Sequence, residues 1–137
     1  PPTVGQTLIE EMGSMGWEGA EARAGAANSI APTLVGGSRK HGGPDIGPTR
    51  AREAWARLGV NGGTLADQPP QPDHSGMPRL TVKMAGLVQG FPETWEFAGG
   101  KTSAYRQVGN AFPPSVARAV GNSIAIALAR SAAVLVE

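Results

Sequence analysis

Tyr105-Arg106-Gln107-Val108-Gly109-Asn110-Ala111-Phe112-Pro113-Pro114 leads directly into an apolar stretch that continues to about Val134. Proline suits the first turn of a helix, and apolar side chains then recur along one stripe, so the pattern predicts a long helix. Gly109 allows a sharp turn, and we expect Asn110 to lie near the N-cap of that helix. The stripe consists of Val116, Val120, Ile124, Leu128 and Leu135. Because the stretch is apolar on several sides, we expect it to dock on a sheet that lies mostly outside this chain.

A second ordered region lies upstream, opening with Arg79-Leu80-Thr81 and closing with Gln89-Gly90-Phe91-Pro92. The threonine suits the N-cap of a helix that runs to Val88, and the glycine and proline that follow end it. Met84 stands three residues after the cap, where a Glu or Gln would complete a capping box. We therefore expect the start of this helix to depend on Thr81 alone.

Further elements are predicted from the N-terminal half of the chain. Helical spacing indicates an amphipathic helix over 4–15, an Ala-rich helix over 20–27 and a helix over 50–58 with Thr49 as its N-cap and Gly59 at its end. Residues 28–35 are expected to form a short extended segment, and the Pro- and Gly-rich residues 59–78 a linker with little to bury. The expected core anchors are Trp17, Trp55 and Trp95.

Composition limits the chemistry available to the chain. With 20 Gly, 12 Pro and 5% aromatic residues among 137 residues, we expect a loop-rich structure with a modest core. The chain has no Cys and only two His, so disulfides, a thiol nucleophile and a zinc site are not expected. It begins without Met and shows no signal peptide or membrane span, so we expect a soluble, cytoplasmic piece of a longer protein.

Positive charge is concentrated near one glycine-rich loop. Residues 1–35 carry one Arg against four Glu, whereas residues 36–57 carry five Arg or Lys against two acidic residues. The loop over 36–44 contains four glycines, so its backbone can approach a ligand closely. A local cluster of this kind favours phosphate binding, although a solvated surface loop is the alternative interpretation.

The order of these blocks resembles the last two conserved motifs of the cytosine-5 DNA methyltransferases. Thr81, Lys83 and the Gln89–Pro92 turn match the first motif, and Gly109–Pro114 matches the second. Met84 and Leu87 depart from it, since the family commonly has an acidic and a basic residue there. The resemblance implies an α+β, loop-rich fragment: the C-terminal portion of a Rossmann-like, S-adenosylmethionine-dependent methyltransferase, with a small target-recognition domain and a long C-terminal helix.

The resemblance also implies site residues and different roles for the two regions of the chain. Residues 1–78 correspond to a target-recognition region, and residues 79–137 to the return segment of the catalytic domain. Asn110 and Ala111 correspond to residues that line the methionine end of S-adenosylmethionine. Thr33, Arg50 and Arg52 are candidate phosphate contacts, and Lys83 is a further candidate DNA contact. Candidates for reading base edges are Ser38, Arg39, Lys40 and His41, with Arg39 first because a guanidinium can read guanine bidentately.

In that family a cysteine attacks carbon 6 of a flipped cytosine, and the absence of cysteine here implies that this fragment holds no catalytic residue and is inactive alone. Its implied partners are double-stranded DNA and an N-terminal catalytic portion. Two alternatives stay open. The chain could be a separate DNA-binding subunit of a split methyltransferase, or a non-catalytic DNA-binding domain in which the Gly-Asn turn is only a helix cap. Tyr105-Arg106-Gln107 could contact DNA or the missing portion.

Overall fold

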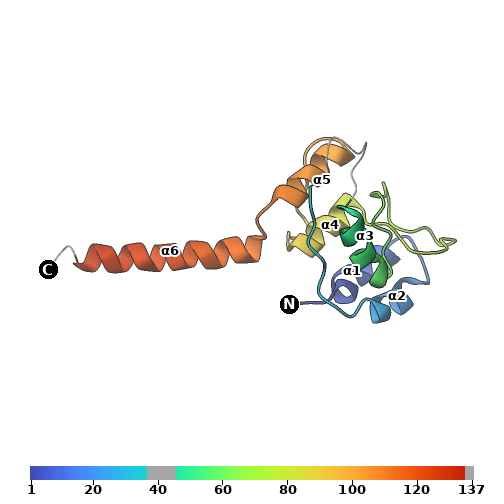
Figure 1. Ribbon diagram of the computed structural model, residues 1–137, viewed down its shortest axis with the longest axis horizontal. Coiled ribbons are helices and arrows are strands. Elements are labelled where there is room, and N and C mark those ends of the chain that lie inside the picture. Colours follow the sequence, from blue (N-terminus) through green and yellow to red (C-terminus); the bar gives the residue numbers. More distant parts are fainter. Residues whose placement is uncertain (37–45, 135–137) are drawn as a thin grey trace.

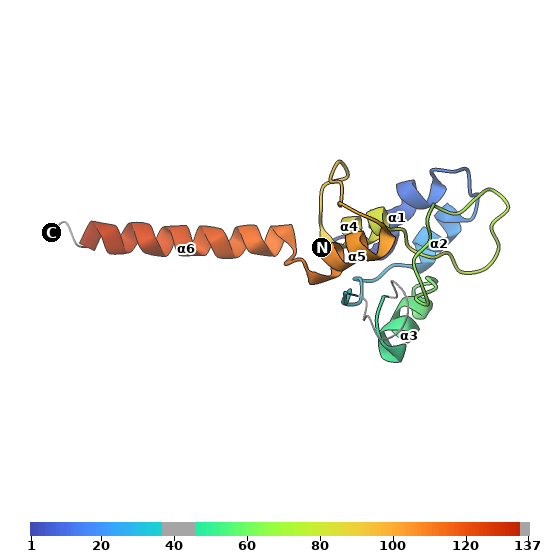
Figure 2. The same cartoon turned by 90° about the horizontal axis from the view of Figure 1, so that it is seen from above.

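The computed structural model describes residues 1–36 and 46–134 of the chain. Helices are the regular elements of this part: α1 (Val4–Gly13), α2 (Ala20–Ala26), α3 (Thr49–Arg57), α4 (Val82–Gln89), α5 (Lys101–Asn110) and α6 (Pro114–Val134). Helices α1 to α5 pack into one body, and α6 projects away from it as a single rod (Figures 1 and 2).

The α+β class expected from the sequence is not what the described residues form, because they contain no strand. Residues 28–36 run as irregular chain rather than as a strand, and Val35 and Gly36 at its end contact α5. The physical reason is that a strand needs a second extended segment to satisfy its backbone groups, and the described part of the chain offers none. Backbone groups of this region bond instead to α1, where the Val4 and Gly5 N–H groups donate to the carbonyls of Ser29 and Ala27 at 2.9 and 3.0 Å.

The core is a continuous apolar cluster with members from α1, near the start of the chain, to α5. Its fully buried members include Trp55, Ile46, Leu65, Leu80, Met84, Tyr105 and Val108. Helix α1 packs against α2 and α4, and α4 packs against α5. The expected boundary near residue 78 therefore does not separate two cores. The division into a recognition region and a return segment stays a proposal about function.

The expectation that residues 59–78 form a linker with little to bury is wrong. Val60, Leu65 and Pro78 are buried in this segment. The Asn61 N–H donates to the Pro78 carbonyl at 2.8 Å, and the Ala66 N–H donates to the Leu80 carbonyl at 2.9 Å. The low apolar content of residues 59–78 was a poor guide to their packing. A few apolar residues and backbone hydrogen bonds are enough to fold this proline-rich segment onto the core.

Helix boundaries agree with the sequence predictions in most places. Helices α1, α2, α3, α4 and α6 lie where their periodicity placed them, and Gly59 has a positive φ of 74° just after α3, as expected for a C-terminal glycine. Thr49 is not the N-cap of α3. Pro48 holds that position without a side-chain bond, and Thr49 is the first helical residue.

Helix α5 was not predicted. Gly109 and Asn110 form its last turn and Ala111 its C-cap, so Asn110 does not stand at the N-cap of α6. Trp17 and Trp55 are buried as expected, but the Trp95 side chain is exposed, at 54%. Trp95 lies on a turn where it contacts Phe91, with ring centroids 5.4 Å apart, instead of entering the core.

Candidate functional site

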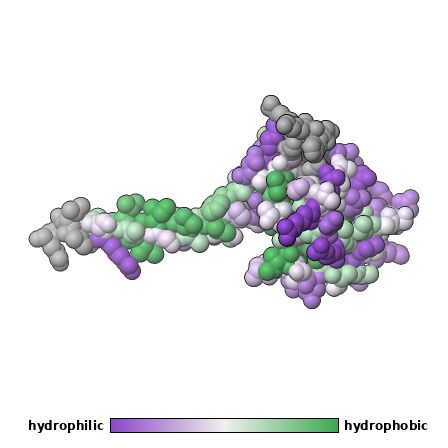
Figure 3. Space-filling model, viewed as in Figure 1, coloured by the Kyte–Doolittle hydropathy of each residue, from purple (hydrophilic) through white to green (hydrophobic). Residues whose placement is uncertain are grey.

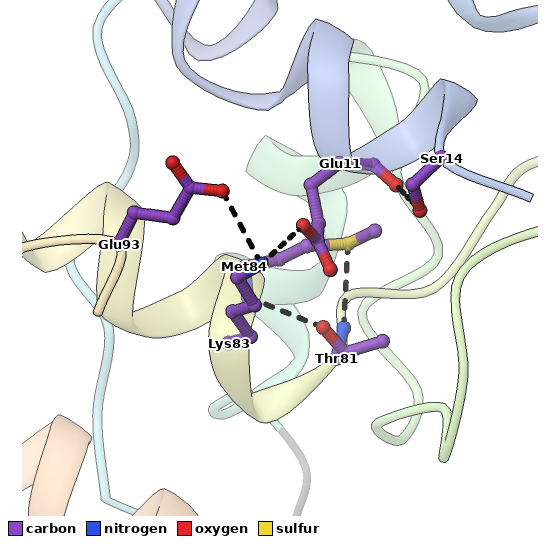
Figure 4. Close-up of polar contacts among 6 residues, drawn as sticks. All are labelled: Glu11, Ser14, Thr81, Lys83, Met84 and Glu93. Carbon is purple, nitrogen blue, oxygen red and sulfur yellow. Dashed lines mark hydrogen bonds and ion pairs between the residues drawn. The ribbon is translucent and has the colours of Figure 1, made fainter. Parts of the chain in front are cut away.

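The first motif begins at the N-terminus of α4, where Thr81 and Met84 form a reciprocal cap (Figure 4). The Thr81 hydroxyl accepts from the Met84 N–H at 3.2 Å, and the Met84 Sδ accepts from the Thr81 N–H at 3.5 Å. The expectation that Thr81 acts alone is therefore wrong. A thioether is a weak acceptor, but here it is fully buried and takes the place of the usual carboxylate.

Lys83 lies on the outer side of α4 between two carboxylates, as Figure 4 shows. Its Nζ is 2.8 Å from Oε2 of Glu11 on α1 and 3.5 Å from Oε1 of Glu93. The hydrogen bond to Glu11 is the main cause that raises the pKa of Lys83 above its ordinary value of 10.5. The charge of Lys83 is thus balanced within the chain, which favours a role in joining α1 to α4 over a role as a free cation.

The two motifs contact each other directly. Gln89, the last residue of α4, donates from Nε2 to the Ala111 carbonyl at 2.8 Å. Gly90 follows with a φ of 90°, which turns the chain sharply toward Phe91. This hydrogen bond fixes the backbone just after Asn110, so the position of the Gly109–Ala111 turn depends on the end of α4.

The same turn also touches the start of the glycine-rich loop. Tyr105 is fully buried, and its Oη donates to the Val35 carbonyl at 2.9 Å. Gly36 lies so close to Gly109 and Asn110 that a Cβ on Gly109 would overlap backbone and a Cβ on Gly36 would displace the Asn110 side chain. Tyr105 thus holds the end of the 28–36 segment on α5.

Comparison with known proteins decides the family. The model of the C-5 cytosine-specific DNA methylase family matches residues 11–125, most of the chain. The chain belongs to this family. The resemblance drawn from the motifs is confirmed by this match.

Relatives in this methylase family cover nearly the whole chain. The Type II methyltransferase M.NaeI of Lentzea aerocolonigenes is 57% identical over 130 residues, which span 93% of this chain and 32% of the relative. The Type II methyltransferase M.NgoMIV of Neisseria gonorrhoeae is 41% identical over 131 residues, 93% of this chain and 41% of the relative. The chain thus spans about a third of the first of these curated relatives and about two fifths of the second. No solved structure matches the chain.

The candidate cofactor residues Asn110 and Ala111 lie together on one turn, at the end of α5. Asn110 is exposed, and Ala111 is half-buried. A surface hollow of about 660 Å³ lies near α4 and α5, but its lining includes neither Asn110 nor Ala111. Residues around this hollow include Lys83, Trp95 and Lys101. A cofactor at the turn would therefore have to be enclosed largely by atoms outside the described residues.

The candidate DNA contacts are less completely defined. Thr33 and Arg50 are exposed, Thr33 just before the loop and Arg50 in the first turn of α3. Arg52 is half-buried, and its Nε donates to the Gly47 carbonyl at 3.1 Å, which holds the end of the loop against α3. The base-reading candidates Ser38, Arg39, Lys40 and His41 lie outside the described residues.

Sequence reasoning missed the residues that join the motifs. Tyr105, Gln89 and Gly36 bring the loop start and the Gly109–Ala111 turn together, yet Tyr105 was considered only for a contact with DNA or the missing portion, and no contact within the chain was predicted for any of them. A buried tyrosine hydroxyl needs a partner, and two glycines with no positive φ indicate a close approach. These signals indicate that each residue makes a close contact. They do not identify its partner, because that partner is distant in the sequence.

None of the helices in the described ranges is long and apolar enough to cross a membrane.

Proposed function

We propose that this chain is the C-terminal part of a Type II DNA (cytosine-5)-methyltransferase, contributing DNA target recognition and part of the S-adenosylmethionine pocket. The observation that carries the proposal is the contact between the Gly109–Ala111 turn and Val35–Gly36, in a chain of this family. That contact puts the cofactor candidate Asn110 beside the start of the glycine-rich loop. Its Type II relatives support a role in restriction and modification.

The turn fits one wall of a cofactor site. Asn110 is exposed and its amide offers both a donor and an acceptor, while the small Ala111 leaves room for a ligand. The Gln89 hydrogen bond uses the Ala111 carbonyl, so the turn is held in place before any ligand arrives. S-adenosylmethionine would supply the methyl group; these residues would bind and orient it.

The recognition role rests on the charged segment from Thr33 to Arg57. Thr33, Arg50 and Arg52 would contact phosphates and set the register on the duplex, and Ser38, Arg39, Lys40 and His41 would reach the major groove. Lys83 is the weakest member of this set, because it already pairs with Glu11 and Glu93. It would meet DNA only if these pairs opened.

An N-terminal catalytic portion is the partner this proposal requires. The chain contains no Cys, so the nucleophile that adds to cytosine must come from elsewhere. Helix α6 would dock on that portion. The apolar residues along its stripe, Val116, Val120, Ile124 and Leu128, are all at least 44% exposed, and Figure 3 shows a mainly hydrophobic surface along the helix. Apolar surface of this extent is typical of an interface.

The cofactor role is tested by titrating the complete enzyme with S-adenosylmethionine. Asn110→Ala should weaken binding about tenfold or more, since a hydrogen-bonded amide is lost from the site. Asn122→Ala, on the exposed helix α6, is the matched control and should bind like the wild type. Unchanged affinity in Asn110→Ala would remove this residue from the cofactor site.

The recognition role is tested by comparing cognate and random duplexes. Arg39→Ala should weaken binding to the cognate site by about 1–3 kcal/mol and binding to random DNA by less, as expected for a base contact. Arg50→Ala should weaken both equally and lower the salt dependence of binding. Equal losses in Arg39→Ala would make Arg39 a phosphate contact.

A further inference from the structure

Two glycines far apart in sequence face each other where the 28–36 segment crosses the last turn of α5. A Cβ built on Gly109 would overlap the backbone nitrogen of Gly36 and lie 2.5 Å from its Cα. A Cβ built on Gly36 would lie 2.7 Å from Oδ1 of Asn110. Ordinary carbon contacts are about 3.5–4.0 Å, so Gly109, whose Cβ would meet backbone, requires glycine, whereas a Cβ on Gly36 would displace the Asn110 side chain. Since neither glycine has a positive φ, the requirement is for space and not for an unusual backbone.

The chain holds this crossing in place on two sides. Tyr105, one turn before Gly109, donates its hydroxyl to the Val35 carbonyl at 2.9 Å and is fully buried. Beyond Asn110, the Ala111 carbonyl accepts from Gln89 at 2.8 Å. Asn110 therefore lies between a fixed turn and the backbone of Gly36. A movement of Val35–Gly36 would therefore change the space available to the Asn110 side chain.

We propose that Gly36 and Tyr105 are positioning residues that couple the target-recognition segment to the cofactor turn. Gly36 sets where the Asn110 amide lies, and Tyr105 keeps Gly36 at that place. DNA binding that draws Val35–Gly36 toward the duplex would shift Asn110, so DNA and S-adenosylmethionine would alter each other's affinity by the same factor. The inference rests on the proposed function and adds a coupling between DNA recognition and cofactor binding.

The test measures S-adenosylmethionine affinity of the complete enzyme with and without a cognate duplex. In the wild type we expect the duplex to change the affinity at least about fivefold, the lower end of typical coupling between sites. Gly36→Ala and Tyr105→Phe should bring this factor close to one. Gly25→Ala is the matched control, because a Cβ on Gly25 meets nothing within 4 Å.

A second readout separates positioning from a general structural role. If Gly36→Ala acts by displacing the Asn110 amide, adding Asn110→Ala should cost little further cofactor affinity. In the Gly25→Ala background, Asn110→Ala should show its full effect. Gly36→Ala is preferred to Gly109→Ala because the group it meets is the end of a side chain, which can move, whereas a Cβ on Gly109 meets backbone. Tyr105→Phe, which keeps the buried ring, serves if Gly36→Ala does not fold.

The outcomes distinguish this inference from the proposed function. If the wild-type enzyme binds both ligands but Gly36→Ala and Tyr105→Phe keep the full coupling, the inference is overturned and the proposed function stands. If the wild type binds both ligands without coupling, the inference fails in the same way. If the complete wild-type enzyme binds neither ligand, the proposed function is overturned together with the inference.

Discussion

Helices α5 and α6 are consecutive, yet they use their apolar residues in opposite ways. In the ten residues of α5, Ala104, Tyr105 and Val108 are buried, the last two completely. In the 21 residues of α6, which projects from the body (Figure 1), Val116, Val120 and Ile124 are all exposed. An apolar pattern thus predicts that a face will be covered, but not which part of the molecule covers it. Helix α5 is covered by this chain, whereas the described part of the chain leaves the apolar residues of α6 uncovered.

The largest expected effect comes from placing a charge on α6. In the complete enzyme, Ile124→Asp should reduce the free energy of unfolding by about 3–5 kcal/mol, because it would bury an unpaired carboxylate in the proposed interface. In the isolated chain the same change should leave the folded body intact. Chemical denaturation and circular dichroism measure both.

Asn122→Asp is the matched control for this charge. Two residues correspond to about 200° around a helix, so Asn122 lies nearly opposite Ile124. It should leave the complete enzyme close to wild type. Equal tolerance of both carboxylates in the complete enzyme would mean that the stripe containing Ile124 faces solvent there too.

A valine pair gives the next largest effect. Val108→Ala on α5 should cost the isolated chain about 2 kcal/mol, since it removes two fully buried methyl groups and leaves a cavity. Val120→Ala on α6 removes the same atoms from a side chain that is 46% exposed and should change stability by less than about 0.5 kcal/mol. Urea unfolding compares the two directly. Similar losses would contradict the contrast between the helices.

The cap of α4 should have a smaller effect. Thr81→Ala removes the hydroxyl that accepts from the Met84 N–H and should cost about 1 kcal/mol. Met84→Leu keeps the buried volume and removes only the weak sulfur acceptor, so it should cost less than Thr81→Ala. A larger loss in Met84→Leu than in Thr81→Ala would mean that the sulfur is the main cap.

Lys83 should give the smallest effect, visible as a pH dependence. Its pKa is raised in the folded chain, so its pairing contributes stability that is fully present below 10.5 and is lost as the pH rises through the folded value. The stability difference between the wild type and Lys83→Met should therefore shrink above that pH. High salt should also shrink it. A difference that persists unchanged in strong alkali would have another cause.

Local signals in the sequence were enough to locate most helices. Apolar spacing placed α1, α4 and α6, and Gly59 ended α3 as expected. Helix α5 was missed because its N-cap Gly100 makes no side-chain bond and Gly109 weakens its last turn. It is stabilised by distant contacts, chiefly Tyr105 with Val35, which no local pattern contains.

The candidate site was predictable as a set of motifs but not as an arrangement. The motif order identified the family, and the family match confirms it. Gln89 contacts Ala111, which is 22 positions away in the sequence. Gly36 contacts Gly109, which is 73 positions away. Such contacts are set by how helices pack, so a single sequence could not reveal them. The roles of Asn110, Ala111 and the DNA candidates stay predictions.

Methyl transfer by separated parts tests the central claim most directly. The isolated 137-residue chain and the N-terminal portion would be purified separately, and transfer from S-adenosylmethionine to a cognate duplex measured for each and for the mixture. The account predicts that neither part transfers methyl groups alone and that the mixture does, with activity lost when the chain carries Asn110→Ala or Ile124→Asp. Methyl transfer by this chain alone, or full specific activity of the N-terminal portion without it, would contradict the account.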